Sequence, residues 1–356
     1  MMERWSVVVG VGRRRAVVLA AAAVLALGST VTPAEAACAK MDEIRVMIFL
    51  SLFNNMVTYI GEDAGFFQKH CLTARLVPVN TGPAGLAQLQ SGSLHFSDSS
   101  FDNVLRARAK GLPIKAVVGE SAGVPYSFVV RKGVPTPNAT AGYPAVMRDI
   151  LGKKVGVFGL GTGSEYFVRT LLRGAGLEPG GVTYIAVGST PTQLAALENG
   201  AVDAVIMADP AQDIAVGSGY GSILVDLRKP GVGPKEIQGL VGTFQVKVAA
   251  EAFLRDQPDV ARRYVQANED TVRWIRDPAN FDQLVKYMSE RVKLGREVPN
   301  ADRLFADLVR QYVAFSAAAI SRRSVQAWNA FELAAGTINA TVRLEDAVWS
   351  GASLTD

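Results

Sequence analysis

The chain has 356 residues, of which 49% are hydrophobic, 20% are charged and two are cysteines. This length is sufficient for two α/β lobes that each bury a core. The net charge is only +4, and the arginines near the N-terminus contribute much of it. We therefore expect no basic surface for nucleic acid or membrane lipid.

The N-terminus has the three-part pattern of a secretory signal. Arg13–Arg15 precede an apolar run at 16–27, and small residues follow up to Ala36. About twelve apolar residues are too few to span a bilayer stably. We predict a signal peptide over residues 1–36, cleavage near Ala36 and a periplasmic mature protein, with a retained anchor as the alternative. The arginines leave the Sec and twin-arginine routes of export open.

The first half of the mature chain alternates apolar strands with helices. A near-continuous apolar run at 44–50 predicts a buried strand. Met56, Val57, Ile60 and Ala64 then recur at helical spacing. Further along we expect a polar turn at 97–100, a helix at 104–109, and strands at 114–118 and 127–133.

The two cysteines stand just before the first two predicted strands. Cys38 precedes the strand at 44–50, and Cys71 precedes the next one. If these strands are parallel neighbours, both thiols lie at one edge of the sheet, and an oxidising compartment would allow them to pair. One disulfide is the hypothesis, and two free thiols are the alternative.

One stretch of the chain occurs twice, at 77–92 and at 185–200. Each copy has a short β-branched run, a polar turn, a Pro in the first helical turn and a Leu- and Ala-rich helix that ends at Gly. An apolar run follows each copy and predicts a further parallel strand. A repeat separated by about a hundred residues suits two similar α/β lobes.

The second lobe opens with a predicted strand at 155–158, a Gly-rich turn and a helix at 164–174. The segment from Glu251 onward reads as helical and is expected to pack on the first lobe. The chain then crosses between the lobes twice, and two crossings form a hinge. We predict crossings near 124–130 and 240–247, a first lobe of residues 37–125 plus 246–356, and a second lobe of residues 126–245.

Ligands of open α/β sheets bind beyond the carboxyl ends of the strands, near helix N-termini. The predicted strand ends are rich in Ser, Thr, Asn and Gly and contain no Lys, Arg, Cys or His. Such residues can hold a small ligand, but they supply no evident nucleophile or metal cage, so we expect no catalytic residue, metal or cofactor. The aromatic residues near these strand ends either form a wall on which a ligand ring stacks or simply pack in the core. The predicted ligand-binding residues are Phe53, Asn54, Asn55, Thr81, Gly82, Asp98, Ser99, Ser100, Ser121, Tyr126, Thr162, Gly163, Ser164, Glu165, Thr190, Asp209 and Phe244.

Three weaker signals have more than one interpretation. The glycine-rich segment 159–164 lies between a strand and a helix, but has Ser where a dinucleotide fingerprint needs its third Gly. A site for a small anion or polar ligand, or a plain tight turn, are the other possibilities. Asp98 and Asp209 follow comparable strands and could act as an acid/base pair, although we favour helix capping for Asp98. His70, next to a cysteine in a predicted loop, and His95, inside a predicted strand, are isolated and show no zinc spacing.

Several short motifs follow one another in a characteristic order between Asp42 and Trp274. They are AGFF at 64–67, the LAQLQSG and LAALENG helices of the repeat, AKGLPIKAVV at 109–118, LGKKVGV at 151–157 with a GTGS turn, and VDAVIMADP at 202–210. In this order the motifs make the chain similar to the periplasmic solute-binding proteins of ABC importers that handle sulfonates, taurine, nitrate and thiamine-pyrimidine precursors.

The resemblance implies a type II solute-binding fold, with two doubly wound α/β lobes, a two-segment hinge and one ligand in the cleft. It also implies an ABC permease and its ATPase as partners, and a monomer without enzymatic activity. Because helix N-termini suit a single negative charge, we expect an anion such as a sulfonate or carboxylate. The acidic strand ends keep a cationic heterocycle as an alternative.

Two other functions remain open. Some relatives on this fold are enzymes, including a desulfinase with a cysteine and a pyrimidine synthase with a cysteine-rich motif. An enzyme built from this chain would act on a small sulfonated, carboxylated or pyrimidine substrate, with Asp98 or Asp209 as its base. The ligand-sensing domain of a regulator is disfavoured by the export signal and by the lack of a basic helix-turn-helix segment.

Overall fold

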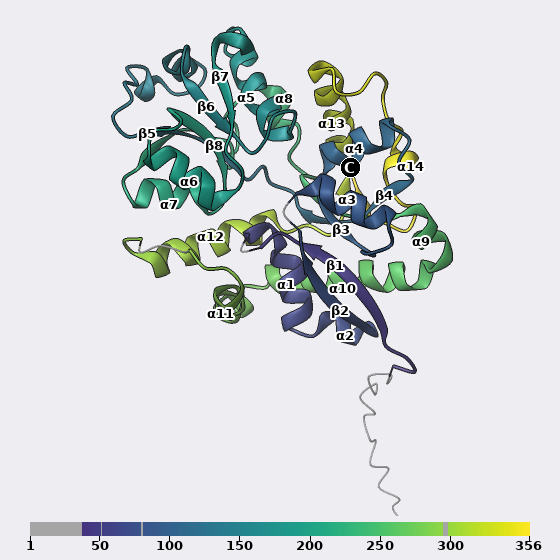
Figure 1. Ribbon diagram of the computed structural model, residues 1–356. Coiled ribbons are helices and arrows are strands. Elements are labelled where there is room, and N and C mark those ends of the chain that lie inside the picture. Colours follow the sequence, from purple (N-terminus) through teal and green to yellow (C-terminus); the bar gives the residue numbers. More distant parts are fainter. Residues whose placement is uncertain (1–37, 51, 80, 295–297) are drawn as a thin grey trace, which may run out of the picture. The chain divides into compact units, whose positions relative to one another are not determined.

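The computed structural model describes residues 38–50, 52–79, 81–294 and 298–356, which form a mixed α/β fold (Figure 1). The predicted signal peptide and its cleavage site lie outside the described residues. Within the described part, no helix combines the length and the apolar character that a membrane crossing requires.

Among the described residues, the main strands of the first lobe are β1 (Asp42–Ile48), β2 (Leu72–Pro78), β3 (Ser97–Ser100), β4 (Ile114–Ser121) and, from much later in the chain, β10 (Gln245–Ala250). β1 and β2 are parallel neighbours, and β10 lies antiparallel between β3 and β4. A parallel bridge between Val46 and Phe96 links the two groups. The spatial order is therefore β2-β1-β3-β10-β4.

The second lobe repeats this order. Its strands are β5 (Tyr126–Arg131), β6 (Lys154–Val157), β7 (Thr183–Ala186), β8 (Ala204–Ala208) and β9 (Gly221–Asp226), arranged as β7-β6-β8-β5-β9. β6 is parallel to both β7 and β8, whereas β5 is antiparallel to β8 and β9. β5 thus takes the place that β10 has in the first lobe. The expectation of two similar α/β lobes is confirmed.

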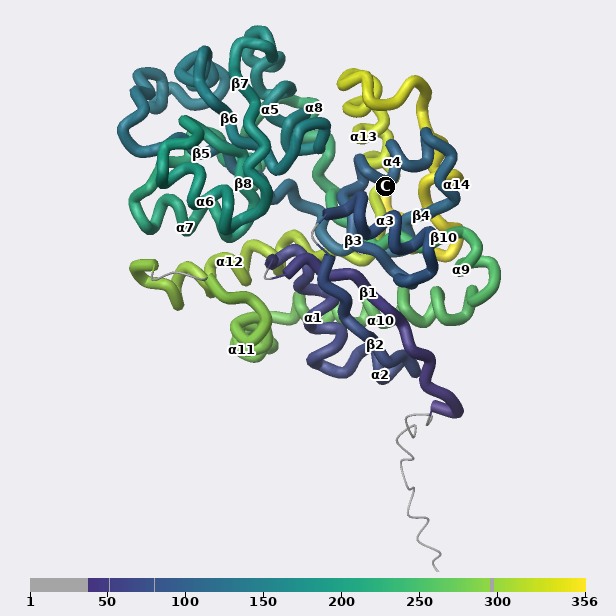
Figure 2. The backbone as a smooth tube through the Cα atoms, in the orientation of Figure 1, coloured from purple at the N-terminus to yellow at the C-terminus, as the bar shows by residue number. Residues whose placement is uncertain are grey.

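Helices connect the strands of both lobes, and Figure 2 allows the chain to be followed through them. They are α1 (Met56–Asp63), α2 (Phe66–Lys69), α3 (Gly82–Gln90), α4 (Phe101–Ala109), α5 (Gly163–Gly174), α6 (Thr190–Glu198), α7 (Ala211–Gly217) and α8 (Lys235–Gln238). The two repeat helices, α3 and α6, each have a Pro in the first turn, where the missing N–H costs no helical hydrogen bond.

The rest of the chain is mainly helical, with two short strands. Its elements are α9 (Glu251–Asp256), α10 (Pro258–Arg276), α11 (Phe281–Arg291), α12 (Ala301–Phe315), β11 (Ile320–Ser321), α13 (Arg322–Ala335), α14 (Leu344–Ala347) and β12 (Leu354–Thr355). α10 packs on α1 and α2, and α13 packs on α4, as expected for the first lobe. α13 also contacts α8, so this part of the chain touches both lobes.

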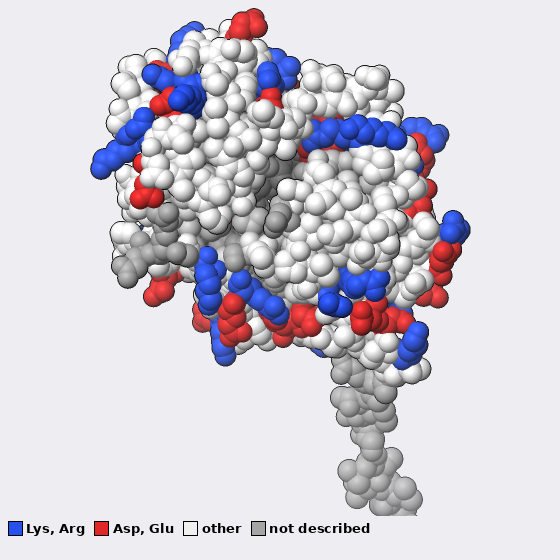
Figure 3. Space-filling view, in the orientation of Figure 1, with Lys and Arg blue, Asp and Glu red and all other residues white. Residues whose placement is uncertain are grey.

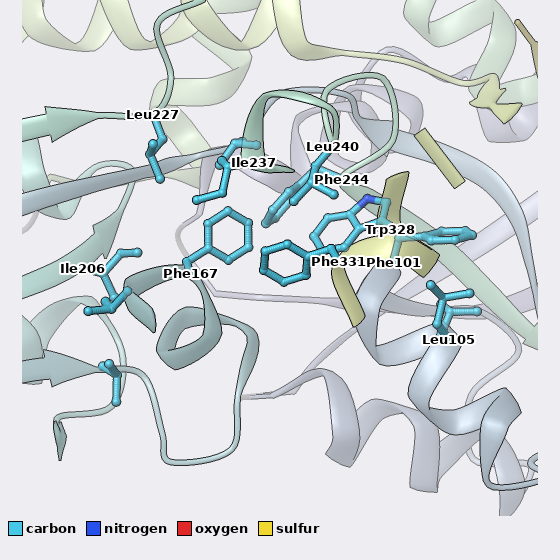
Figure 4. Packing of buried hydrophobic residues seen from close by; sticks show 14 of the residues in the cluster. Phe101, Leu105, Phe167, Ile206, Leu227, Ile237, Leu240, Phe244, Trp328 and Phe331 are labelled. Carbon is cyan, nitrogen blue, oxygen red and sulfur yellow. The ribbon is translucent and has the colours of Figure 1, made fainter. Parts of the chain in front are cut away.

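Aromatic side chains connect α13 to the second lobe (Figure 4). The ring of Trp328 lies 6.2 Å from that of Phe167 on α5 and 5.7 Å from that of Phe244. Trp328 is fully buried, and its Nε1 donates a hydrogen bond of 2.6 Å to the carbonyl oxygen of Thr243. The apolar core is therefore continuous from the hinge region to both lobes.

Two local expectations are wrong. Residues 97–100 form strand β3 rather than a polar turn, because β10 pairs with them from about 150 residues further along the chain. His95 lies in a bend before β3 and not inside a strand. Its Nδ1 accepts a hydrogen bond of 3.1 Å from the backbone N–H of Arg45.

Candidate ligand-binding site

The strand ends of the first lobe enclose a buried charged cluster. Lys247 Nζ on β10 lies 2.8 Å from Asp98 Oδ2 on β3 and 3.6 Å from Glu120 Oε2 on β4, and all three side chains have 0% exposure. Gln245 Nε2 donates a hydrogen bond to the other oxygen of Asp98. Two carboxylates and one ammonium leave a surplus negative charge in a place where charge is costly.

Because of this surplus, the cluster binds protons more readily than exposed groups would. Burial raises the pKa of the Glu120 carboxyl to about 7, although Lys247 opposes the shift. Burial alone would lower the pKa of Lys247, but the carboxylates of Asp98 and Glu120 raise it above its usual value. Lys247 therefore stays charged at neutral pH, and Glu120 is near its midpoint.

The second lobe has apolar side chains where the first lobe has this ion pair. In the β10–β3 ladder, Lys247 is opposite Asp98. We align the two lobes at the parallel pairing of their central strands, β1 with β3 in the first lobe and β6 with β8 in the second. The pair in the second lobe that matches Lys247 and Asp98 is then Phe128 and Ile206, in the β5–β8 ladder. Apolar side chains commonly stabilise a core as well as a buried ion pair does, or better. The charges of the first lobe therefore indicate a role other than stability.

The same register corrects our interpretation of the two aspartates. Asp98 lies within β3, where it bonds to Lys247, and the N-cap residue of α4 is Ser100. Asp98 is thus not a helix cap. Asp209 lies one residue beyond the end of β8, so the two aspartates do not occupy comparable positions.

A second charged cluster lies where α4 of the first lobe meets α5 of the second. Arg106 bonds to Asp102 one turn earlier and lies 3.6 Å from Glu332 on α13. Its guanidinium is 5.5 Å from the centre of the Tyr166 ring on α5. A Cβ added to Gly163, the first residue of α5, would be only 2.7 Å from Asp102 Oδ2. Burial raises the pKa of Glu332 to about 7, a shift that Asp102 increases.

A third cluster surrounds Arg228, just after β9. Its guanidinium lies 2.7 Å from Asp209 Oδ1, 2.6 Å from Asp213 Oδ2 and 2.8 Å from Asp226 Oδ1. Gln311 Nε2, from α12, donates a hydrogen bond of 2.8 Å to Asp209 Oδ2. Burial raises the pKa of Asp209 to about 7 against the opposing effect of Arg228. The strand end of the second lobe is therefore held against α12.

The expectation that no cation lies near the strand ends is thus wrong. Lys247 lies within β10 and Arg106 within α4, whereas Arg228 lies in the loop after β9, a strand end that we did not include among the predicted site residues. Each of these cations is ion-paired with more than one carboxylate. Lys247 and Arg106 each have two carboxylate partners, and Arg228 has three. Lys229 also contacts Asp226, but its side chain is 72% exposed.

Oxygens of the chain itself occupy several of the helix N-termini at which we expected an anion. Glu120 Oε1 accepts hydrogen bonds from the N–H and the hydroxyl of Thr58, in the first turn of α1, at 3.1 and 2.9 Å. Thr81 Oγ1 caps α3 at 3.3 Å. Glu165 Oε2 accepts the N–H of Gly161, in the loop before α5, at 2.7 Å. These groups already receive the partners that a ligand anion would supply.

Several buried polar atoms near the strand ends have no hydrogen-bond partner in the described part of the chain. They are Asn54 Oδ1, Ser99 Oγ, Asp102 Oδ1, Glu120 Oε2 and Ser121 Oγ. Except for Asn54, their residues are at most 3% exposed. Buried polar atoms are normally paired, so these positions suit a ligand or ordered water.

The other predicted site residues have structural roles. Phe53 stacks on Phe305 and Tyr312 of α12, and Tyr126 and Phe244 pack in the aromatic core. The hydroxyl and amide side chains among the others form hydrogen bonds within loops or stand at the start of helices, and the two glycines are the first residues of α3 and α5. These residues are Asn55, Gly82, Ser100, Thr162, Gly163, Ser164 and Thr190.

Two cavities of the described part are lined by other residues. One, of about 340 Å³, is lined by residues that include Gly242 and Ser321. The other, of about 430 Å³, lies beside α13 near Leu333. None of the predicted ligand-binding residues lines either cavity.

Sequence reasoning missed Lys247, Arg228 and Gln311, which come from distant segments, and also Asp102 and Arg106 on α4, which directly follows the predicted site residues at 98–100. Only Lys247 had a usable signal, since it is the single charge in the apolar run 246–250. A lone Lys in a buried strand requires a buried carboxylate as its partner.

Both cysteines, Cys38 and Cys71, are disulfide-bonded. β1 and β2 pair in parallel with Asp42 opposite Leu72, which is the arrangement on which the pairing hypothesis depended. The residues described by the structure include no cluster of His, Cys, Asp or Glu suited to a metal ion.

Two similarly ordered α/β sheets, joined by two crossings and with polar strand ends in contact, define the fold of periplasmic solute-binding proteins. A Bordetella bronchiseptica RB50 structure is similar over 90% of this chain and 95% of its own, with 20% identity and a TM-score of 0.68. The alkanesulfonate-binding protein SsuA of Xanthomonas axonopodis pv. citri, bound to MOPS, has 16% identity and a TM-score of 0.66 over 88% of this chain and 98% of its own.

The chain belongs to the NMT1/THI5-like family, whose profile matches residues 53–280. Among characterised proteins, the riboflavin-binding protein RibY of Chloroflexus aurantiacus is 28% identical over 180 residues. The alignment covers 49% of this chain and 44% of RibY, so the chain matches less than half of that relative. The resemblance to ABC-importer binding proteins is confirmed at the level of family and fold.

Proposed function

We propose that the mature chain is an extracytoplasmic receptor that captures one small organic solute between its lobes and delivers it to an ABC permease. The observation that supports this proposal is the contact between the lobes, in which Gln311 of α12 bonds to Asp209 at the strand end beyond β8. The similarity to solute-binding proteins supports it. In this proposal residues 1–36 are removed on export, and the receptor acts as a monomer.

The lobes of the receptor are residues 37–125 plus 246–356 and residues 126–245. The ligand lies among the predicted strand-end residues, of which Asn54, Ser99 and Ser121 have buried atoms free to accept it. Closure brings ligand contacts from both lobes together, so the ligand shifts the open and closed populations by its difference in affinity for the two states. The permease and its ATPase then recognise the closed form.

A thermal-shift screen of residues 37–356 tests this function. The compounds are sulfonates, carboxylates, nitrate, pyrimidines and riboflavin. A ligand that binds only the folded state raises the Tm, and we expect the compound that does so also to reduce the radius of gyration in X-ray scattering. The receptor proposal fails if no solute of any class changes either quantity.

The enzyme alternative rests on one observation. The carboxyls of Glu120 and Asp209 have pKa values raised to about 7 by burial, which is the range of a general base. Asp98 is a poorer candidate, because Lys247 and Gln245 occupy its oxygens. Recovery of the bound solute unchanged after long incubation would support the receptor, and its conversion, lost in Asp209→Asn, would support the enzyme.

A further inference from the structure

We infer that the solute is a small organic cation with N–H donors, recognised by the surplus carboxylates at the strand ends. This inference rests on the proposed function, because it names the chemical class of the solute held at the same site. It replaces the anion that the sequence led us to expect.

The balance of buried charge is the first reason. Lys247, Arg106 and Arg228 each face at least two carboxylates. In the view of Figure 3 the middle of the visible face carries few charged side chains, consistent with the burial of these clusters. A ligand cation would take over from bound protons the role of neutralising these carboxylates, whereas a ligand anion would add to the surplus negative charge.

The positions suited to an anion are the second reason. The first turn of α1 is bonded to Glu120, and the first residue of α5 lies against Asp102, which comes from the other lobe. A ligand sulfonate or carboxylate would have to displace these carboxylates and leave them without partners. Such unpaired buried charges are costly.

The unpartnered oxygens are the third reason, because each can accept a hydrogen bond, although Arg106 Nη1, a donor, is also unpartnered. Asp102 Oδ1, Glu120 Oε2 and Asn54 Oδ1 are acceptors only, and the hydroxyls of Ser99 and Ser121 accept as well as donate. A Cβ on Gly82 would lie 2.9 Å from Asn103 Nδ2 and 3.1 Å from Ser99 Oγ, so only glycine fits beside Ser99 without displacing a neighbour. Acceptors that lack donors call for a ligand with several N–H groups.

Four compounds that share one ring and differ in the attached group test the inference: benzamidine, benzamide, benzoate and benzenesulfonate. The measurement is the Tm of residues 37–356, followed by calorimetry in two buffers that differ in ionisation enthalpy. We expect benzamidine to raise the Tm most and to release protons on binding, because a cation lowers the pKa of neighbouring carboxyls. Stabilisation by benzoate or benzenesulfonate in preference to benzamidine would overturn the inference.

Substitutions locate the binding. Asp102→Asn, Glu120→Gln and Asp209→Asn each remove one charge with little change in shape, and each should weaken benzamidine binding on the order of tenfold. Asp259→Asn is the matched control, since its side chain is 82% exposed on α10, and it should leave binding unchanged. Benzamidine binding that is insensitive to all three buried substitutions lies elsewhere and contradicts the inference.

The remaining outcomes separate this inference from the proposed function. Benzamide as effective as benzamidine would show that charge is not recognised, while the receptor function would stand. If the four compounds are silent but the wider screen finds a solute, a cation supports the inference and an anion or neutral solute overturns it. If neither the four compounds nor the wider screen yields a ligand, the proposed receptor function is contradicted as well.

Discussion

Asn55 and Ser164 occupy matching positions in the two lobes. Asn55 Oδ1 accepts the backbone N–H of Phe49, six residues earlier, at 3.1 Å, and Ser164 Oγ accepts that of Phe158, also six residues earlier, at 3.0 Å. Each bond closes the loop between the central parallel strand and the helix that follows it. The same closing hydrogen bond is therefore made in both lobes although the amino acids that accept it differ.

These two bonds predict different costs for the two alanine variants. Asn55 is fully buried and its amide also donates to carbonyl oxygens of the same loop, so Asn55→Ala should lower the free energy of unfolding by about 2–3 kcal/mol. Ser164→Ala loses one main bond and should cost about 1 kcal/mol. Chemical denaturation measures both, with exposed Ser91→Ala as a control expected to stay within about 0.5 kcal/mol. Equal effects of the three substitutions would contradict the matching roles.

The buried ion pair predicts strong non-additivity. Lys247→Met leaves Asp98 and Glu120 buried without their cation and should lower the free energy of unfolding by about 3–5 kcal/mol. The double variant Asp98→Leu/Lys247→Met resembles the apolar pair Phe128 and Ile206 of the second lobe and should recover most of this loss. Equilibrium unfolding in urea compares the two, and a double variant no more stable than the single one would speak against the equivalence.

The raised carboxyl pKa values predict that stability falls as the pH rises. In Glu120, Asp209 and Glu332 the folded-state pKa is about 7, well above the pKa of the unfolded chain. At a pH between these two pKa values, the folded state therefore binds more protons than the unfolded state. The free energy of unfolding should therefore decrease from about pH 5 to about pH 7.5, at a rate on the order of 1 kcal/mol per pH unit for each group. Glu120→Gln should make the Tm profile shallower, whereas a Tm that increases over this range contradicts the prediction.

The aromatic contact of α13 predicts a link between stability and lobe closure. Trp328→Ala removes a fully buried ring that packs on Phe167 and Phe244 and should cost about 3–5 kcal/mol. Trp328→Phe retains part of the packing and should cost less. X-ray scattering of the folded variants should show a larger radius of gyration for Trp328→Ala, and an unchanged radius would exclude a role in closure.

The cysteines predict the behaviour of the unreduced protein. We expect a thiol-labelling reagent to modify neither Cys38 nor Cys71 in the denatured, unreduced mature chain, and to modify both after reduction. Reduction should lower stability by about 2–4 kcal/mol. Cys38→Ser should reproduce that loss, and a labelled thiol before reduction would rule out the bond.

Periodicity was sufficient for much of the fold. The apolar run that became β1, and the repeat that became β2-α3 and β7-α6-β8, were predicted because burial imposes periods of two and 3.6 on local sequence. The strand at 97–100 was not, because its partner β10 is about 150 residues away. Local polarity made this segment resemble a turn.

The sequence by itself determined the two similar α/β lobes and the loops at which a ligand could bind, since these follow from the order of neighbouring residues. Only the tertiary structure decided the electrostatic character of those loops. Lys247, Arg228 and Gln311 reach Asp98 and Asp209 from other elements, and Glu332 of α13 approaches Arg106 of α4. Electrostatic interaction depends on distance and burial rather than on sequence separation, so the balance of charge at the site could not be predicted from the strand-end residues alone.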